Sequence, residues 1–379
     1  MYNVFMAKKT SNFFNAIFNI FLFLPHFFSA LPLLKTLFYP WKRLITKKET
    51  LGFSFNEWFN TFTFNIISRA LGFVMRSCLL LAFLFFEIVY ILLIPFIILI
   101  FFILLPFILI MSNLKESEDV KKAKLKKQFV TSHSLTKETY RSSEIWFDYI
   151  YDKHIKKKIW WDLKNLKTIS PLARDWAIGY TPNLDKYCDN LISPQYQSIE
   201  RHIVGRIKEI EELEQMLSKT SRANALIVGD EGIGKHTIID AFSNRIYQGQ
   251  SNAILNYKRV LKLNLEFVLT ETTDQKQREA LVEALFNEAS SAGNVILLLF
   301  DFERYVVSSR EGVNLMLPIQ KFAESPNLQF IASTTPYYFE KYVYHNEKLN
   351  QLFPRLNVSE VTKDDALKIL MDIALDFER

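Results

Sequence analysis

A glycine-rich loop constrains the fold of this chain more than any other feature. Residues 229–237 read GDEGIGKHT; they follow the apolar run 225–228 and precede a helical pattern of apolar residues from 238 to 246. A buried strand, such a loop and a helix, in that order, are the context of a phosphate-binding loop. The glycines let backbone N–H groups turn toward a phosphate at the helix N-terminus, and the lysine neutralises phosphate oxygens. The loop therefore predicts a nucleoside triphosphate site, and its contact residues are Gly229, Gly232, Ile233, Gly234, Lys235, His236 and Thr237.

The position directly after the loop lysine departs from the usual pattern. An Mg²⁺ ion bound to the phosphates normally takes a hydroxyl oxygen there. In this chain the position holds His236, and the hydroxyl comes one residue later, at Thr237. A second apolar run, residues 296–300, ends in Asp301, and a carboxylate at the end of a buried strand can hold the water shell of a metal. Thr237 and Asp301 are therefore the predicted metal contacts, and His236 argues against fast hydrolysis.

A long apolar stretch indicates a membrane. The chain contains 34 Phe among 379 residues, and in residues 77–111 the only charge is Glu87. A helix of this length would measure about 50 Å, whereas the hydrocarbon core of a bilayer is about 30 Å thick. Pro95 either divides the stretch into two short spans, residues 77–94 and 96–111, or kinks one long tilted helix. Glu87 has no ionisable partner within the stretch, which favours a structural role and argues against a transporter.

Positive charge flanks this stretch on both sides. The basic residues before it are Lys42, Arg43, Lys47, Lys48, Arg69 and Arg76, and those after it are Lys115, Lys121, Lys122, Lys124, Lys126 and Lys127. Because basic flanks favour the cytoplasmic side, an even number of crossings is expected. ATP is a cytosolic ligand, so the nucleotide domain of this membrane protein is expected to face the cytoplasm.

Two further segments outside the nucleotide region are expected to touch lipid. Residues 13–41 are apolar and aromatic but interrupted by prolines, which indicates an interfacial segment lying on the bilayer; a signal peptide cleaved after residues 29–30 is the alternative. Residues 113–170 are rich in lysine and contain Trp146, Trp160 and Trp161. Lysine and tryptophan beside a membrane stretch favour a lipid bilayer as partner over a nucleic acid. This part is predicted to be a juxtamembrane stalk.

The rest of the chain alternates between strand and helix patterns. Strands are expected at residues 259–265, 295–300 and 330–332, and helices at 275–290 and 312–324. This alternation predicts an α/β domain.

Several short motifs in this region resemble the first AAA+ module of the Clp unfoldase and disaggregase family. In chain order they are residues 180–187 (YTPNLDKY), 204–210 (VGRIKEI), the loop at 229–237, Asp301, 314–318 (NLMLP) and 332–336 (ASTTP). The resemblance covers roughly residues 178–375. It implies a P-loop AAA+ fold with a parallel sheet flanked by helices, binding of ATP with Mg²⁺, and homo- or hetero-oligomeric rings that act on protein substrates. It also places Val204 and Gly205 beside the adenine and Thr335 at the polar sensor of the γ-phosphate.

The resemblance completes the expected division of the chain. The expected parts are a membrane-interfacial N-terminal region (1–70), a transmembrane helix or helical hairpin (71–112), a basic stalk (113–177), the AAA+ nucleotide-binding domain (178–360) and the start of a truncated helical lid (361–379). The chain stops inside what resembles the first lid helix. Either it is a fragment of a longer product or the lid is dispensed with.

The departures from the family pattern concern hydrolysis. Where the family has a catalytic glutamate after the aspartate, this chain has Phe302, with Glu303 one position later. Where the family has paired arginines, residues 351–352 are Gln-Leu, and the loop at 270–274 lacks the family's aromatic residue. An arginine finger alone is worth about 10³–10⁵ in rate. Two functions therefore stay open: a membrane-anchored protein-remodelling ATPase in which Asp301, Glu303 and Thr335 carry the chemistry, or a nucleotide-binding scaffold or adaptor with impaired hydrolysis.

Overall fold

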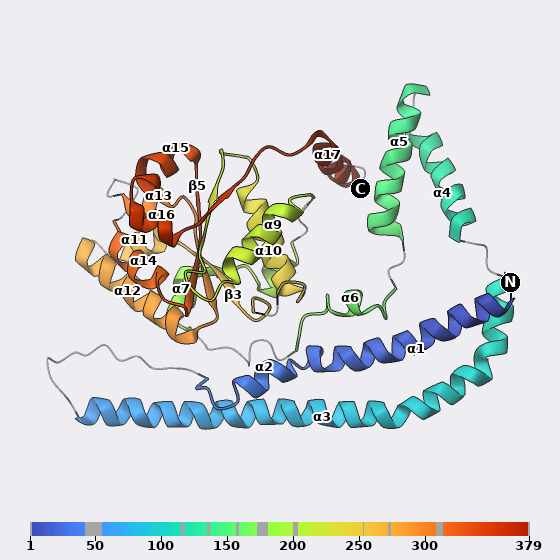
Figure 1. Ribbon diagram of the computed structural model, residues 1–379, viewed down its shortest axis with the longest axis horizontal. Helices are drawn as coiled ribbons and strands as arrows, with labels where there is room; N and C mark the ends of the chain where they lie inside the picture. The colour runs from blue at the N-terminus through green and yellow to red at the C-terminus, as the bar shows by residue number, and fades with distance from the viewer. Residues whose placement is uncertain are drawn as a thin grey trace. The chain divides into compact units, whose positions relative to one another are not determined.

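The computed structural model describes ten stretches of the chain: residues 2–41, 55–114, 118–134, 137–156, 159–172, 181–199, 204–252, 254–271, 274–307 and 314–377 (Figure 1). By its internal contacts the chain divides into two units. The first comprises Met1–Leu24, Phe83–Leu166 and Val361–Arg379; the second comprises Pro25–Ala82 and Lys167–Glu360.

The second unit is built on a six-stranded, mostly parallel sheet. Its order is β1 (Cys188–Asn190), β3 (Arg259–Leu263), β4 (Val295–Leu299), β5 (Leu328–Thr334), β2 (Ala225–Val228) and β6 (Arg355–Asn357). Every neighbouring pair is parallel except β1 and β3. The prediction of an α/β domain is confirmed, and the three strands expected after the loop correspond to β3, β4 and β5.

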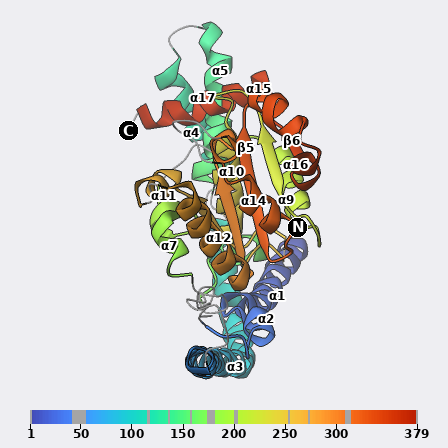
Figure 2. The same cartoon turned by 90° about the vertical axis from the view of Figure 1, so that its left-hand side faces the viewer.

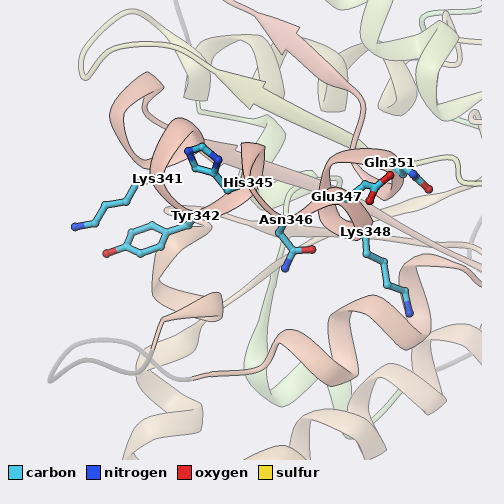
Figure 3. A pocket seen from close by; sticks show the side chains of 7 residues that line it. All are labelled: Lys341, Tyr342, His345, Asn346, Glu347, Lys348 and Gln351. Carbon is cyan, nitrogen blue, oxygen red and sulfur yellow. The ribbon is translucent and has the colours of Figure 1, made fainter.

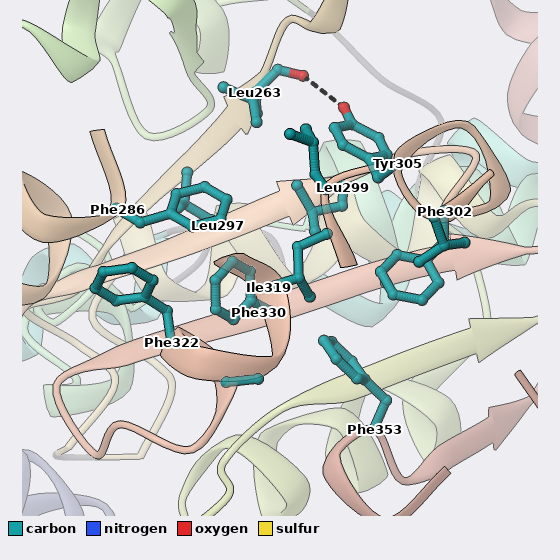
Figure 4. Close-up of a cluster of buried hydrophobic side chains, with 14 of the residues drawn as sticks. Leu263, Phe286, Leu297, Leu299, Phe302, Tyr305, Ile319, Phe322, Phe330 and Phe353 are labelled. Carbon is teal, nitrogen blue, oxygen red and sulfur yellow. Dashed lines mark hydrogen bonds between the residues drawn. The ribbon is translucent and has the colours of Figure 1, made fainter. Parts of the chain in front are cut away.

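Both faces of the sheet are buried, which explains why its strands read as continuous apolar runs. Successive side chains of a strand point to opposite faces, so Leu226 and Val228 join one apolar cluster whereas Ala225 and Ile227 join the other. Helices α12 (Gln275–Ala292) and α14 (Met316–Ala323) cover the first face, shown in Figures 2 and 4. Helices α9 (Ile207–Leu217) and α10 (Lys235–Tyr247) cover the second.

Short helices complete this α/β region. They are α7 (Leu184–Tyr187), α8 (Pro194–Gln197), α11 (Leu265–Glu271), α13 (Glu303–Val306), α15 (Pro336–Tyr338), the π-helical η3 (Phe339–Tyr344) and α16 (Glu347–Leu352). The Arg259 guanidinium on β3 donates to Thr181 Oγ1 at 2.7 Å and to an Asp185 carboxylate oxygen at 2.6 Å. The segment that leads into the domain is therefore tied to the edge of the sheet.

The apolar stretch lies in one helix. Helix α3 runs from Phe55 to Leu114 and continues through Pro95 and Pro106, so of the two sequence alternatives the structure has the single helix. Helices α1 (Tyr2–Phe27) and α2 (Ala30–Lys35) precede it. Two segments are long and apolar enough to cross a membrane by length and composition, Lys9–Lys35 and Trp58–Phe107.

In the second unit, the chain after α2 is held against α3. The Arg76 guanidinium donates to the backbone carbonyl oxygens of Thr36 at 2.6 Å and Tyr39 at 2.5 Å. A Cβ at Gly72 would lie 3.2 Å from the same Tyr39 oxygen, so glycine permits this close approach. Arg76, predicted as a basic flank of the apolar stretch, is buried and acts here as a bridge between two chain segments.

In the first unit, the predicted stalk is a folded helical hairpin. It consists of α4 (Glu118–His133) and α5 (Lys137–Ile150), followed by the π-helical η1 (Tyr151–Ile155) and α6 (Leu163–Leu166). Phe129 contacts Trp146 and Phe147 across the hairpin, with ring centroids 5.2 and 5.5 Å apart. Lys122 and Lys126 pair with Asp148 at 3.0 and 2.9 Å. Two of the lysines expected to face lipid are therefore partly neutralised within the hairpin.

Helix α17 (Lys363–Phe377), which the sequence assigns to the start of a lid, packs on α5 in this first unit. The Trp146 indole donates to the Met371 carbonyl oxygen at 3.0 Å. The buried Asp372 carboxylate accepts from the Lys153 ammonium at 2.5 Å and from the Tyr149 hydroxyl at 3.5 Å. A buried carboxylate needs such partners, so these contacts hold α17 on the hairpin.

The stability of the fold is expected to depend on Lys258, just before β3. Burial lowers the pKa of Lys258 to about 8. Between pH 8 and its unfolded value of 10.5 the unfolded chain binds more protons than the folded one, so stability should rise with pH in this window. Lys258→Met should remove that rise and increase the free energy of unfolding at pH 7 by about 2–3 kcal/mol. Urea unfolding of the full chain at pH 7, 9 and 10.5 measures both effects; an unchanged pH profile in the variant would contradict the assignment.

Candidate functional site

The loop between β2 and α10 has the backbone conformation that its glycines predict. Gly232 and Gly234 adopt φ values of 75° and 101°, in the left-handed region that favours glycine. A Cβ at Gly229 would lie 3.0 Å from Ile233 Cγ2 and 3.1 Å from Val358 Cβ, so glycine is needed there for close packing. The loop is therefore a concave turn ahead of a helix N-terminus, a geometry suited to a phosphate.

Lys235 begins α10, and its ammonium lies over this loop. Its Nζ donates to the carbonyl oxygens of Gly229 at 2.6 Å and Asp230 at 3.0 Å. A Cβ at Gly234 would lie 3.9 Å from the Thr237 hydroxyl oxygen, so this side chain lies beside the loop in the first turn of the helix. The cation, the hydroxyl and the loop glycines predicted from sequence therefore come together.

His236 turns to the side of the loop. Its ring stacks on Phe300 with the centroids 4.2 Å apart and an angle of 10° between the planes. The Lys262 ammonium lies 5.5 Å from the centre of the same Phe300 ring. Partial desolvation of the ring, followed by the nearby Lys262 charge, lowers the pKa of His236. The imidazole of His236 is therefore packed on the Phe300 ring.

The turn after β4 explains what Phe302 does in place of a glutamate. Asp301 adopts φ 53°, which is strained for a residue with a side chain. The next residue, Phe302, is fully buried, and its ring lies 5.1 Å from that of Phe353 (Figure 4). Its backbone N–H donates to the Ser333 carbonyl oxygen at 2.8 Å. Position 302 therefore points into the core, away from the loop.

Glu303, one position later, returns to the site. It is the first residue of α13, and its carboxylate accepts a hydrogen bond from Thr334 Oγ1 at 2.8 Å. Burial raises the pKa of Glu303, and Asp301 and Lys235 are among the charges that act on it. The charges of Asp301 and Lys235 thus lie close enough to Glu303 to act on its carboxylate.

The polar partner of Glu303 is Thr334, to which the sequence analysis gave no role. Thr334 is the buried last residue of β5 and pairs with Val228 of β2 directly before the loop. Thr335 instead caps α15, where its hydroxyl accepts from the Tyr338 N–H at 3.4 Å. Adjacent residues at the end of a strand point to opposite faces of the sheet, so the strand register determines which of the two threonines faces Glu303.

The segment with Val204 and Gly205 lies beside the loop and is fastened to it by Arg206. Gly205 and Arg206 have φ values of 73° and 60°, which form the turn before α9. The Arg206 guanidinium donates to the Ile233 carbonyl oxygen at 2.9 Å and to the Ser359 carbonyl oxygen at 2.6 Å. The loop is therefore linked to this segment and to the chain leaving β6.

Arg206→Ala should loosen the loop. A hydrogen bond from a charged donor contributes about 1.5–3 kcal/mol, and the bond to Ser359 is weakened by its exposure to solvent, so we expect the free energy of unfolding to fall by about 2–4 kcal/mol. Arg206→Lys keeps the charge but lacks the planar guanidinium that donates to two carbonyl oxygens at once. It should therefore recover less than half of the lost free energy of unfolding. Urea unfolding of both variants measures the change in the free energy of unfolding. Equal stability of the alanine variant and the unchanged chain would contradict the linking role.

The positions at which the Clp family has its paired arginines and its substrate loop lie on another part of the α/β region. Gln351 lines a shallow hollow of about 720 Å³, shown in Figure 3. Its other lining residues are Lys341, Tyr342, His345, Asn346, Glu347 and Lys348. Arg355 is the arginine nearest in sequence to residues 351–352. Its guanidinium lies 5.0 Å from the ring centre of Phe339. Of the expected substrate loop at 270–274, residues 272–273 lie outside the described part of the chain.

Comparison with known proteins identifies the relatives of this region. No protein-family model matches the chain. It is 26% identical over 205 residues to the chloroplastic chaperone ClpD of Arabidopsis thaliana and 26% identical over 203 residues to ClpC/MecB of Bacillus subtilis, a negative regulator of genetic competence. It is 27% identical over 195 residues to the chaperone ClpB of Oceanobacillus iheyensis. The chain is homologous to the Clp/Hsp104 AAA+ family over about half its length.

The homology covers a limited part of each relative. The matches take in 52%, 52% and 50% of this chain but 21%, 25% and 24% of ClpD, ClpC/MecB and ClpB. Among solved structures, the chain is similar to Hsp104 of S. cerevisiae in its complex with casein, with a TM-score of 0.47 and 20% identity over 52% of this chain and 34% of that one.

Proposed function

We propose that this chain is a membrane-attached, Clp-like AAA+ protein that binds ATP with Mg²⁺ and uses it to remodel protein substrates on the cytoplasmic face. The observation that carries the proposal is the convergence of Lys235, Asp301 and Glu303 around a loop shaped for phosphate. The homology with Clp chaperones supports the remodelling role and an oligomeric ring.

We assign a separate role to each group of residues at this site. The N–H groups of the loop and the Lys235 ammonium bind the phosphates, and Thr237 and Asp301 provide the oxygen ligands that Mg²⁺ prefers. When bound there, Mg²⁺ would neutralise charge on the transferred phosphoryl group. Glu303, held by Thr334, accepts a proton from the attacking water. Its raised pKa suits this role, because a general base works best when its pKa approaches the ambient pH.

The second candidate function is a nucleotide-binding scaffold or adaptor with weak hydrolysis. It is favoured by the stacked His236 in place of a hydroxyl, by the buried Phe302 and by Gln351 at the family's arginine position. Such a subunit would occupy a mixed ring whose other members supply the missing groups.

Membrane attachment is supported by α3. Most of its apolar side chains between residues 81 and 107 are exposed, which would be costly in water over so long a helix. Basic residues flank this stretch in sequence, and its length and composition fit a membrane.

Steady-state ATP hydrolysis by the detergent-purified chain tests the proposal, with Lys235→Ala as the blank. Turnover above the blank supports the remodelling ATPase, and turnover equal to it supports the scaffold. Flotation with phospholipid vesicles tests attachment separately: a chain that stays at the bottom of the gradient would contradict it.

A further inference from the structure

Helix α4 has an inner side that contacts α5 in the first unit. The ammonium groups of Lys122 and Lys126 pair with the Asp148 carboxylate at 3.0 and 2.9 Å. Glu144 is a second carboxylate of α5 on this side and lies 3.8 Å from the Lys126 ammonium. These ion pairs direct two of the five lysines of α4 toward α5.

The other three lysines of α4 share the opposite side of the helix. They are Lys121, Lys124 and Lys127, and all three are exposed. With about 100° between successive residues, each is rotated by about 60° from the one before, so the three span about 120°. Lys122 and Lys126 each lie about 160° from Lys124 around the helix. The three exposed lysines therefore form an outer lysine face that points away from α5.

The outer lysine face has little compensating negative charge. Residues 120–133 contain neither Asp nor Glu, and Asp119 lies about 140° around the helix from Lys124. Neither Lys121 nor Lys127 forms an ion pair within the described stretches of the chain. Like charges one helical turn apart repel each other, so an anionic surface that neutralises them would stabilise this face.

The apolar neighbours of these lysines favour a lipid surface. Val120 is 47% exposed and lies about 40° from Lys124; Leu125 is 42% exposed and lies about 40° from Lys121. Lysines bind the phosphates of lipids and of nucleic acids alike, whereas aliphatic side chains beside them are stabilised only where acyl chains are close by.

The chain also keeps this face close to the apolar stretch. Helix α3 ends at Leu114, and Lys121 follows seven residues later, which is at most about 25 Å of extended chain. Attraction to a charged membrane surface extends over about 10 Å at 0.1 M salt, so position along the chain allows such an interaction.

We propose that the outer lysine face of α4 binds the headgroups of anionic phospholipids next to the apolar stretch of α3. The inference rests on the proposed membrane attachment and goes further, because it names the class of lipid and the residues that select it. Lys122 and Lys126 have a different role and hold α4 on α5.

A fluorophore on the outer side of α4 tests the inference. Gln128 is exposed and lies about 40° from Lys124, so Gln128→Cys is introduced in a Cys78→Ser background and labelled. Cys188 is retained, because burial raises its thiol pKa and keeps it unreactive. The full chain is reconstituted in phosphatidylcholine vesicles with or without phosphatidylglycerol. Both kinds of vesicle contain a lipid whose headgroup carries a nitroxide quencher.

Phosphatidylglycerol should increase the quenching at least about twofold at low salt, and about 0.5 M salt should remove the increase by screening. Replacing the outer lysine face with glutamine (Lys121→Gln, Lys124→Gln and Lys127→Gln) should abolish the increase. The matched control removes three exposed lysines of the nucleotide domain (Lys186→Gln, Lys219→Gln and Lys276→Gln) and should retain it.

Three results would overturn the inference. They are equal quenching with and without phosphatidylglycerol, an increase that survives replacement of the outer lysine face, and an increase lost equally in both triple variants. A fluorescence response to an RNA oligonucleotide, with none to phosphatidylglycerol, would overturn it in favour of a nucleic acid. Failure of the unchanged chain to float with the vesicles would instead contradict the membrane attachment.

Discussion

Phe302→Glu, which introduces the residue that the Clp resemblance expects at this position, should destabilise the protein and leave ATP hydrolysis no faster. Phe302 is fully buried against Phe353, and its backbone is held by Ser333. A glutamate there would place an unpaired carboxylate in the core, at a cost of about 3–5 kcal/mol. Urea unfolding of the full chain should show a loss of that size.

Phe302→Leu is the matched control. It keeps the position apolar and should cost only about 1–2 kcal/mol. If the glutamate variant were as stable as the leucine variant and hydrolysed ATP faster, position 302 would face the site and the structural account of this turn would be wrong.

Glu303→Gln should lower ATP turnover by about 10²–10⁴-fold while leaving ATP affinity within about threefold, if the chain hydrolyses ATP as proposed. The amide keeps the shape of the side chain but cannot accept a proton from water. Because burial raises the pKa of Glu303, the turnover of the unchanged chain should fall with decreasing pH at a higher pH than an ordinary glutamate would give. Steady-state rates from pH 5 to 8 measure this acid limb.

Thr334→Val is the companion variant, because it removes the hydrogen bond to Glu303 but keeps the size of the side chain. It should lower turnover less than Glu303→Gln and shift the acid limb to higher pH, since the hydrogen bond favours the charged carboxylate. Unchanged turnover in Glu303→Gln would exclude Glu303 as the proton acceptor.

The conformation of the glycine-rich loop was predictable because its signals are local. The glycines, the lysine and the adjacent apolar strand are consecutive in sequence, and the left-handed φ values at Gly232 and Gly234 follow from the turn itself. The strands could be assigned for a related reason: a parallel sheet covered on both faces requires continuous apolar runs. Both features depend on residues that are neighbours along the chain.

The remaining features depend on contacts between distant segments. The position of Thr334 beside Glu303 depends on the pairing of β5 with β2, and the burial of Phe302 depends on its contact with Phe353. The partner of Asp372, Lys153, lies far away in sequence, so the packing of α17 on α5 could not be read from either helix alone. Local patterns contain no information about such pairings.

Direct ATP binding tests the central claim most simply. A fluorescent ATP analogue is titrated with Mg²⁺ into the detergent-purified chain, Lys235→Ala and the exposed-lysine control Lys276→Ala. We expect saturable binding by the unchanged chain and by Lys276→Ala, and an affinity at least about tenfold weaker for Lys235→Ala, because a charge-assisted contact with phosphate is lost. Equal affinity of all three proteins, or no binding by any, would contradict the assignment of residues 229–237 as a nucleotide site.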